Sequence, residues 1–125
     1  MNLTVRRSLV AMVLSIGSTS LVLGAEFPEG ATKPNAEELK QRLADKIFDV
    51  KLANGGSWRL EYKSNGYFFI NTNTNFNGTG DWHTEDGKIC GNLRGRGPAC
   101  NDARLFNGVI HYLRDNGEVV QFVAR

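Results

Sequence analysis

Turn signals recur roughly every 8 to 14 residues through the last two-thirds of the chain, and no helical pattern separates them. Between the turns, apolar and polar residues alternate, as Trp58, Leu60 and Tyr62 do with their polar neighbours. Parallel strands need long crossover connections, usually helical, so successive strands here should be antiparallel. The sequence therefore predicts a mainly β fold: an antiparallel meander of about seven strands, curled into a barrel or half-barrel that removes its edges. The expected strands are 57–63, a second that starts at 67–70 and runs into 71–75, and then 80–85, 88–93, 99–106, 109–113 and 119–123.

One helix is expected before the strands. Asn35 can cap it, and Glu38 three residues later completes a capping box. Leu39, Leu43 and Ile47 fall on one stripe at a spacing of four residues, and the pattern fades near Lys46. So narrow an apolar stripe needs a partner surface, so we expect the helix to plug one end of the barrel or to cover its open side.

The first 25 residues have the order of a secretory signal peptide. Arg6 and Arg7 precede an apolar run over 9–23, and Gly24-Ala25 stand before the polar Glu26. A membrane anchor is the alternative, but serine, glycine and threonine interrupt the run, which favours cleavage. We expect an exported protein, periplasmic or secreted, with a flexible leader at 26–34, one domain at 35–125 and no transmembrane segment in the mature chain.

The charge balance argues against a nucleic-acid partner. The full chain carries 15 Lys plus Arg and 13 Asp plus Glu, and residues 1–25 contribute two arginines and no acid. The mature chain would then have no net charge, whereas nucleic-acid binding proteins present a basic surface.

Cys90 and Cys100 are the two cysteines. In an oxidising compartment an even pair is most simply a disulfide. A three-residue turn at Arg94-Gly95-Arg96 would place the two cysteines directly across a hairpin from each other, close enough for a bond. A redox-active pair or a metal site is disfavoured, because there is no Cys-x-x-Cys motif and two sulfurs do not complete a tetrahedral site.

Several of these features occur together in one group of proteins. From Trp58 to Cys100 the chain resembles small exported bacterial β proteins of calycin-like type, most of which are uncharacterised. The shared pattern is a helix leading into the first strand, an aromatic strand with a glycine turn, a Gly-x-Trp, an Asp-Gly-x-x-Cys and a second cysteine about ten residues later. In this chain these are Leu39 to Val50, Trp58 to Gly66, Gly80-Asp81-Trp82, Asp86 to Cys90, and Cys100. The resemblance implies the fold but no activity, and because lipocalins carry Gly-x-Trp on their first strand, no lipocalin ligand is carried over.

One strand offers a candidate catalytic or metal cluster. Asp81, His83 and Glu85 alternate and should share one face of the strand at 80–85. With His111 from a later strand they would form a carboxylate–imidazole cluster for acid/base hydrolysis, or a metal site. The competing interpretation is an ordinary solvated strand face, which we favour.

An asparagine row suggests a second candidate site. Asn71, Asn73 and Asn75 alternate with threonines, so their amides would line one face of a strand and could hydrogen-bond a sugar. A polar outer face or barrel lip explains the same pattern.

The turn at Arg94 and Arg96 is the third candidate. Two arginines project from a short loop that the disulfide would hold rigid, so ordering the loop against a partner costs little entropy. The competing interpretation is a tight turn that needs glycine.

We expect large aromatic residues to fill the barrel interior rather than to line a cavity, because a domain of this length has little volume to spare. The leading functional hypothesis is a monomeric, non-enzymatic domain without a cofactor. It would recognise a protein or a cell-envelope component through its surface, as an inhibitor does, with Arg94 and Arg96 at the contact. Two alternatives stay open: a calycin-like carrier of a small apolar ligand, and the hydrolase or metal site at Asp81, His83, Glu85 and His111.

Overall fold

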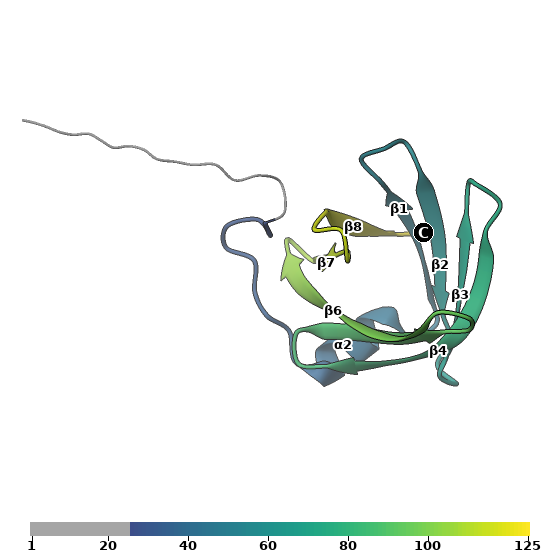
Figure 1. Ribbon diagram of the computed structural model, residues 1–125. Coiled ribbons are helices and arrows are strands. Elements are labelled where there is room, and N and C mark those ends of the chain that lie inside the picture. Colours follow the sequence, from purple (N-terminus) through teal and green to yellow (C-terminus); the bar gives the residue numbers. More distant parts are fainter. Residues whose placement is uncertain (1–25) are drawn as a thin grey trace, which may run out of the picture.

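The computed structural model describes residues 26–125 as one closed antiparallel β-barrel with a short helix at one end (Figure 1). The strands are paired in chain order, β1 to β8, and β8 returns to β1. The expected meander is thus confirmed, and it closes fully. The elements are α2 (Ala36–Leu43), β1 (Lys46–Lys51), β2 (Ser57–Tyr62), β3 (Tyr67–Thr72), β4 (Asn77–Glu85), β5 (Lys88–Leu93), β6 (Gly97–Phe106), β7 (Val109–Leu113) and β8 (Val119–Ala124).

The barrel has eight strands, and β1 is the one that the sequence analysis missed. Ile47 belongs to β1, so its assignment to the helical stripe was wrong. The helix ends at Leu43, and Asp45 turns the chain with a positive φ of 61°. The backbone N–H of Asp45 then donates to the carbonyl of Tyr62 at 2.7 Å, which starts the β1–β2 ladder. The helix therefore ends at Leu43 because strand pairing begins there, although the helical spacing of apolar residues continues to Ile47.

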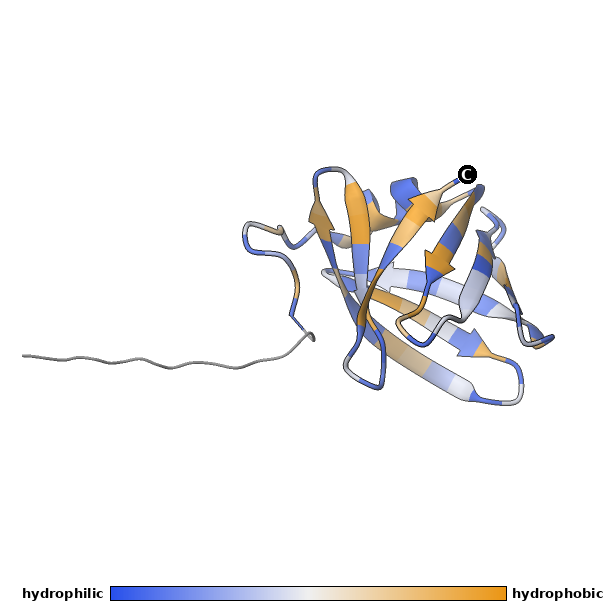
Figure 2. Cartoon of the chain, turned by 90° about the horizontal axis from the view of Figure 1, so that it is seen from above, coloured by the Kyte–Doolittle hydropathy of each residue, from blue (hydrophilic) through white to orange (hydrophobic). Residues whose placement is uncertain are grey.

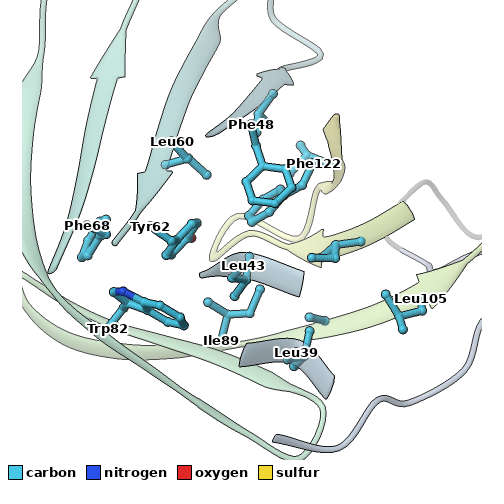
Figure 3. Packing of buried hydrophobic residues seen from close by; sticks show 14 residues of the cluster. Leu39, Leu43, Phe48, Leu60, Tyr62, Phe68, Trp82, Ile89, Leu105 and Phe122 are labelled. Atoms are coloured by element: carbon cyan, nitrogen blue, oxygen red, sulfur yellow. The ribbon is translucent and has the colours of Figure 1, made fainter. Parts of the chain in front are cut away.

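Helix α2 begins as predicted. The side chain of Asn35 accepts a hydrogen bond from the backbone N–H of Glu38 at 2.8 Å, which satisfies one free donor of the first turn. Leu39 and Leu43 are fully buried and fasten the helix to the barrel. Figure 3 shows both leucines beside Ile89 and Trp82.

The helix covers one end of the barrel, which we call the closed end. The hydroxyl of Thr84 donates to the carbonyl of Ala36 at 2.6 Å, and Asp86 accepts from the N–H of Ala36 at 2.9 Å. Arg42 donates to the carbonyl of Gly108 at 3.3 Å, so α2 is tied to two turns at this end. The turns at 52–56, 73–76, 94–96 and 114–118 surround the opposite end, which we call the open end.

Alternation along the strands separates the two faces of the wall (Figure 2). On β5 and β6 the cysteines project outward, and Cys90 lies directly opposite Cys100 in the register. The predicted disulfide Cys90–Cys100 is present, and the turn between the strands is 94–96 as expected. Closing a loop of this length contributes roughly 2–3 kcal/mol to stability.

The segment before the helix lies against β6. Thr32 forms an isolated bridge with Leu105, with backbone hydrogen bonds of 2.8 and 2.9 Å. The flexibility proposed for 26–34 stays a prediction. The signal-peptide hypothesis concerns residues 1–25, which lie outside the described part. Within 26–125, no helix has the length and apolar character needed to cross a bilayer.

Candidate functional site

The half of the barrel next to α2 is filled by aromatic side chains. The ring of Tyr62 packs edge-on against Trp82, with centroids 5.2 Å apart, and is stacked on Phe68 at 5.9 Å. The rings of Phe122 and Phe48 pack against each other on the other side of the barrel, with centroids 5.4 Å apart. Figure 3 shows these side chains converging on the barrel axis. In this half the expected filled interior is confirmed.

The other half holds a cavity of about 540 Å³ that opens at the open end. Its walls are mainly apolar, and its rim is polar. The expectation that side chains fill the whole interior was therefore wrong, because the eight-stranded barrel encloses more space than the meander pattern implied. The residues that line it include Trp58, Leu60, Tyr62, Phe68, Ile70, Ile89, Gly91, Leu93, Arg96, Ala99, Asn101, Tyr112, Arg114, Asp115 and Phe122.

Small residues form part of the cavity wall on β5 and β6. Gly91 pairs with Ala99, and both line the cavity. A Cβ atom on Gly91 would lie 3.3 Å from the ring of Phe68, so glycine lets that ring pack against the wall. Gly97, which also lines the cavity, has no heavy atom of another residue within 4 Å of the position that a Cβ would take, so the wall is unfilled there.

The rim of the cavity is held by fixed contacts. The guanidinium of Arg114 lies over the ring of Trp58, 5.0 Å from its centroid, and forms an ion pair with Glu118. The side-chain amide of Asn101 donates to the carbonyl of Leu113 at 3.0 Å and to a carboxylate oxygen of Asp115 at 2.8 Å. These contacts hold the β7–β8 turn at the mouth, which leaves the cavity preformed.

Two tyrosine hydroxyls lie within this interior. Tyr62 is only 5% exposed, and burial raises the pKa of its phenol far above the ordinary value. Burial, aided by the negative charge of Asp115, raises the pKa of Tyr112 to about 12. No hydrogen bond joins either hydroxyl to another group of residues 26–125, and both tyrosines border the cavity.

The structure separates the residues of the candidate hydrolase or metal cluster. His83 and Glu85 project outward from β4, with 3.1 Å between Nε2 and the carboxylate oxygen. Their nearest further metal-ligating atoms are the sulfurs of Cys90 and Cys100, which are joined in the disulfide and provide no thiolate. His111 lies on β7, with β5 and β6 between it and β4, and its ring packs edge-on against Phe106 with centroids 6.0 Å apart. Asp81 shares the outer face with His83 but is outside this group, so the four predicted ligands do not converge.

The asparagines do not form one row, so that prediction was wrong. β3 ends at Thr72, and only Asn71 lies on the strand. The side chain of Asn71 donates to that of Asn77 at 2.7 Å. Asn73 accepts from the N–H of Ser57 at 3.0 Å and so braces the neighbouring turn. Asn75 takes a positive φ of 68° in the turn, which asparagine tolerates well. A sugar-binding role for Asn71, Asn73 and Asn75 stays a prediction, and the three side chains do not share one face of a strand.

The two arginines of the 94–96 turn have different environments. Arg96 lines the cavity, and its guanidinium lies 5.4 Å from the centroid of the Phe76 ring. Both arginines are exposed and, with Tyr67 and Asp81, line a shallow depression on the outside of the barrel. Their predicted role as one contact loop is untested, but only Arg96 is also placed to meet a molecule inside the barrel.

The fold and the cavity together define a class: a closed eight-stranded meander barrel with one helix, one disulfide and a hollow open half. Comparison of the chain with models of known families, with curated proteins and with solved structures finds no match.

Sequence reasoning expected Trp58 and Tyr112 inside the barrel as core, with a place in a cavity wall as the alternative, and it gave Asn101 no role. One signal was present. Gly91, Gly97 and Ala99 are small residues at inward positions of a hairpin, and such positions cannot fill a barrel.

Proposed function

We propose that this protein binds a small apolar molecule in the open half of the barrel, as an exported carrier or binding protein. The cavity carries the proposal. Its volume of about 540 Å³ lies within the range of small-molecule sites, and its walls combine aromatic and aliphatic side chains with a few polar groups.

The preformed mouth supports the same function. Because the Trp58–Arg114 and Asn101–Asp115 contacts already exist, binding requires little ordering of side chains. The resemblance to calycin-like exported proteins and the disulfide, a bond typical of oxidising compartments, favour a role outside the cytoplasm.

A cavity-filling variant tests the proposal. Ala99→Trp places an indole in the cavity, because Ala99 lines it and its side chain is exposed there. Asn92→Trp adds the same group on the outer face of the same hairpin and serves as the matched control. The neutral dye N-phenyl-1-naphthylamine should fluoresce with the unaltered protein and with Asn92→Trp, and Ala99→Trp should lose most of that signal.

Equal dye binding by all three proteins, or none by the unaltered protein, would contradict a cavity site. Native mass spectrometry of protein purified from its own host gives a second measurement. A bound mass that Ala99→Trp lacks is the expected result.

Surface recognition is the second candidate function. Exposed Tyr67 and Phe69 on β3 lie on the outer wall, and Tyr67 borders the depression that Arg94 lines. Aromatic residues and arginine are enriched in the contact regions that dominate protein–protein binding. A partner from an envelope extract should be retained by Ala99→Trp but lost by an Arg94→Ala, Arg96→Ala double variant. Equal recovery of all partners by both forms would reject the loop.

A further inference from the structure

We infer that the ligand carries an uncharged hydrogen-bond-accepting oxygen, which lies at the cavity floor against the hydroxyl of Tyr62. This inference rests on the proposed binding function and specifies its ligand class: an apolar body with a carbonyl, ether or similar oxygen at its inner end.

Tyr62 is the main reason. Its ring is fixed on several sides by Phe48, Phe68, Trp82 and Phe122, so its hydroxyl cannot turn out to solvent. Yet the residue borders the cavity, and within the described chain its O–H has no acceptor. Trp82 shows the contrast: its indole N–H, similarly buried, donates to the carbonyl of Lys63 at 2.9 Å. A core that satisfies one buried donor and leaves the next facing an open cavity is arranged to receive an acceptor there.

Tyr112 adds a second donor. Its ring packs on that of Phe122, with centroids 5.1 Å apart, and it borders the same cavity from β7. The ring of Phe122 also lies 6.4 Å from that of Tyr62, centroid to centroid, so both phenols belong to one aromatic cluster along the cavity wall. A carbonyl or ether oxygen has two lone pairs and can accept from the O–H of Tyr62, while Tyr112 offers a further donor nearer the mouth.

The surroundings select against a charged group at the floor. Leu60, Phe68, Ile89 and Phe122 form the inner lining, and the charged residues of the cavity, Arg96, Arg114 and Asp115, come from the turns at the rim. An ion placed among these apolar side chains would lose its hydration without gaining a counter-charge. A neutral oxygen loses far less.

A matched ligand pair and a matched pair of variants test the inference. Butyrophenone and n-butylbenzene differ only in that a ketone oxygen replaces two hydrogens, and 4-phenylbutanoate adds a charged arm. Titration calorimetry should show the unaltered protein binding butyrophenone about five- to tenfold more tightly than n-butylbenzene, and 4-phenylbutanoate most weakly.

Tyr62→Phe removes one oxygen atom and keeps the shape of the core. It should reduce the preference for the ketone to about twofold or less, and leave binding of n-butylbenzene unchanged or tighter. Tyr67→Phe makes the same change on an exposed residue of the outer wall, 51% exposed, and should keep the full preference. The melting temperature of Tyr62→Phe without ligand should be equal to or above that of the unaltered protein, because the lost hydroxyl has no partner.

The possible outcomes separate the two proposals. If none of the three probes binds, the cavity function itself fails. If n-butylbenzene and butyrophenone bind equally and Tyr62→Phe changes neither, binding stands and the tyrosine anchor is overturned. Tightest binding by 4-phenylbutanoate, or a lower melting temperature for Tyr62→Phe, would also overturn the anchor.

Discussion

The closed and open halves of this barrel are built from the same strands, and they differ in what faces the axis. Near α2, Phe48, Tyr62 and Trp82 meet with the leucines of the helix and fill the interior. Towards the turns at 94–96 and 114–118, glycine and alanine occupy inward positions and a cavity remains. The comparison teaches that strand alternation builds the wall, whereas the size of inward side chains and the presence of a cap decide whether a region is core or site.

The largest expected effect tests whether the closed half carries the stability. Leu43→Ala removes a fully buried side chain where α2 meets the core, and it should lower the free energy of unfolding by about 2–5 kcal/mol. Ile70→Ala removes a similar volume beside the existing cavity and should cost less than about 2 kcal/mol, because the partly exposed site leaves less apolar surface to lose. Urea denaturation of both variants measures the difference. Equal losses would break the comparison.

The disulfide gives the next effect. It joins β5 and β6, the hairpin whose small residues form one wall of the cavity. A Cys90→Ala, Cys100→Ala variant should lose roughly 2–3 kcal/mol of stability. Hydrogen exchange should then rise most on this hairpin and least on α2. A uniform rise over the barrel would show that the two halves unfold as one unit.

Acid should have the smallest effect. The ammonium of Lys88, 2.8 Å away, holds the pKa of Asp102 below its usual value, and the guanidinium of Arg125 does the same for Asp49. A carboxyl whose pKa is lower in the folded state contributes stability that is present above the unfolded value of about 3.9 and is lost as pH falls through the folded one. Thermal unfolding should therefore show constant stability above about pH 5 and a decline below pH 4.

Asp102→Asn serves as the matched variant for this effect. It should be slightly less stable than the unaltered protein at pH 7, and the difference between the two should shrink as the pH falls below 4. A difference that grows in acid would contradict the assignment, since protonated Asp102 and asparagine carry the same charge.

Local signals in the sequence were enough to predict the main features of the fold. Asn35 and Glu38 marked the start of the helix, and the Arg94-Gly95-Arg96 turn placed the cysteines in register. The strand at 46–51 was missed, because Ile47 fits the helical spacing as well as it fits the strand. Only the pairing of Asp45 with Tyr62 decides between the two.

The candidate site was less predictable. Alternation correctly assigned His83 and Glu85 to one face of a strand, but it held no information on where His111 would lie around the barrel. The asparagine row failed for a similar reason, since it assumed that β3 continued to Asn75, whereas the chain turns after Thr72. The spacing of Arg94 and Arg96 likewise held no sign that Arg96 alone of the two would also line the cavity.

By itself, the sequence determined the antiparallel meander, the capped helix and the cystine partner, because each depends on residues close together in the chain. Tertiary structure decided that the sheet closes with eight strands, that one half stays hollow, and that the hydroxyl of Tyr62, which borders the hollow, has no hydrogen-bond partner among residues 26–125. These features depend on the combined volume of the side chains that strands far apart in the sequence point towards the barrel axis. The alternation of residues along a strand specifies which face a residue takes, but not how much space lies in front of that residue.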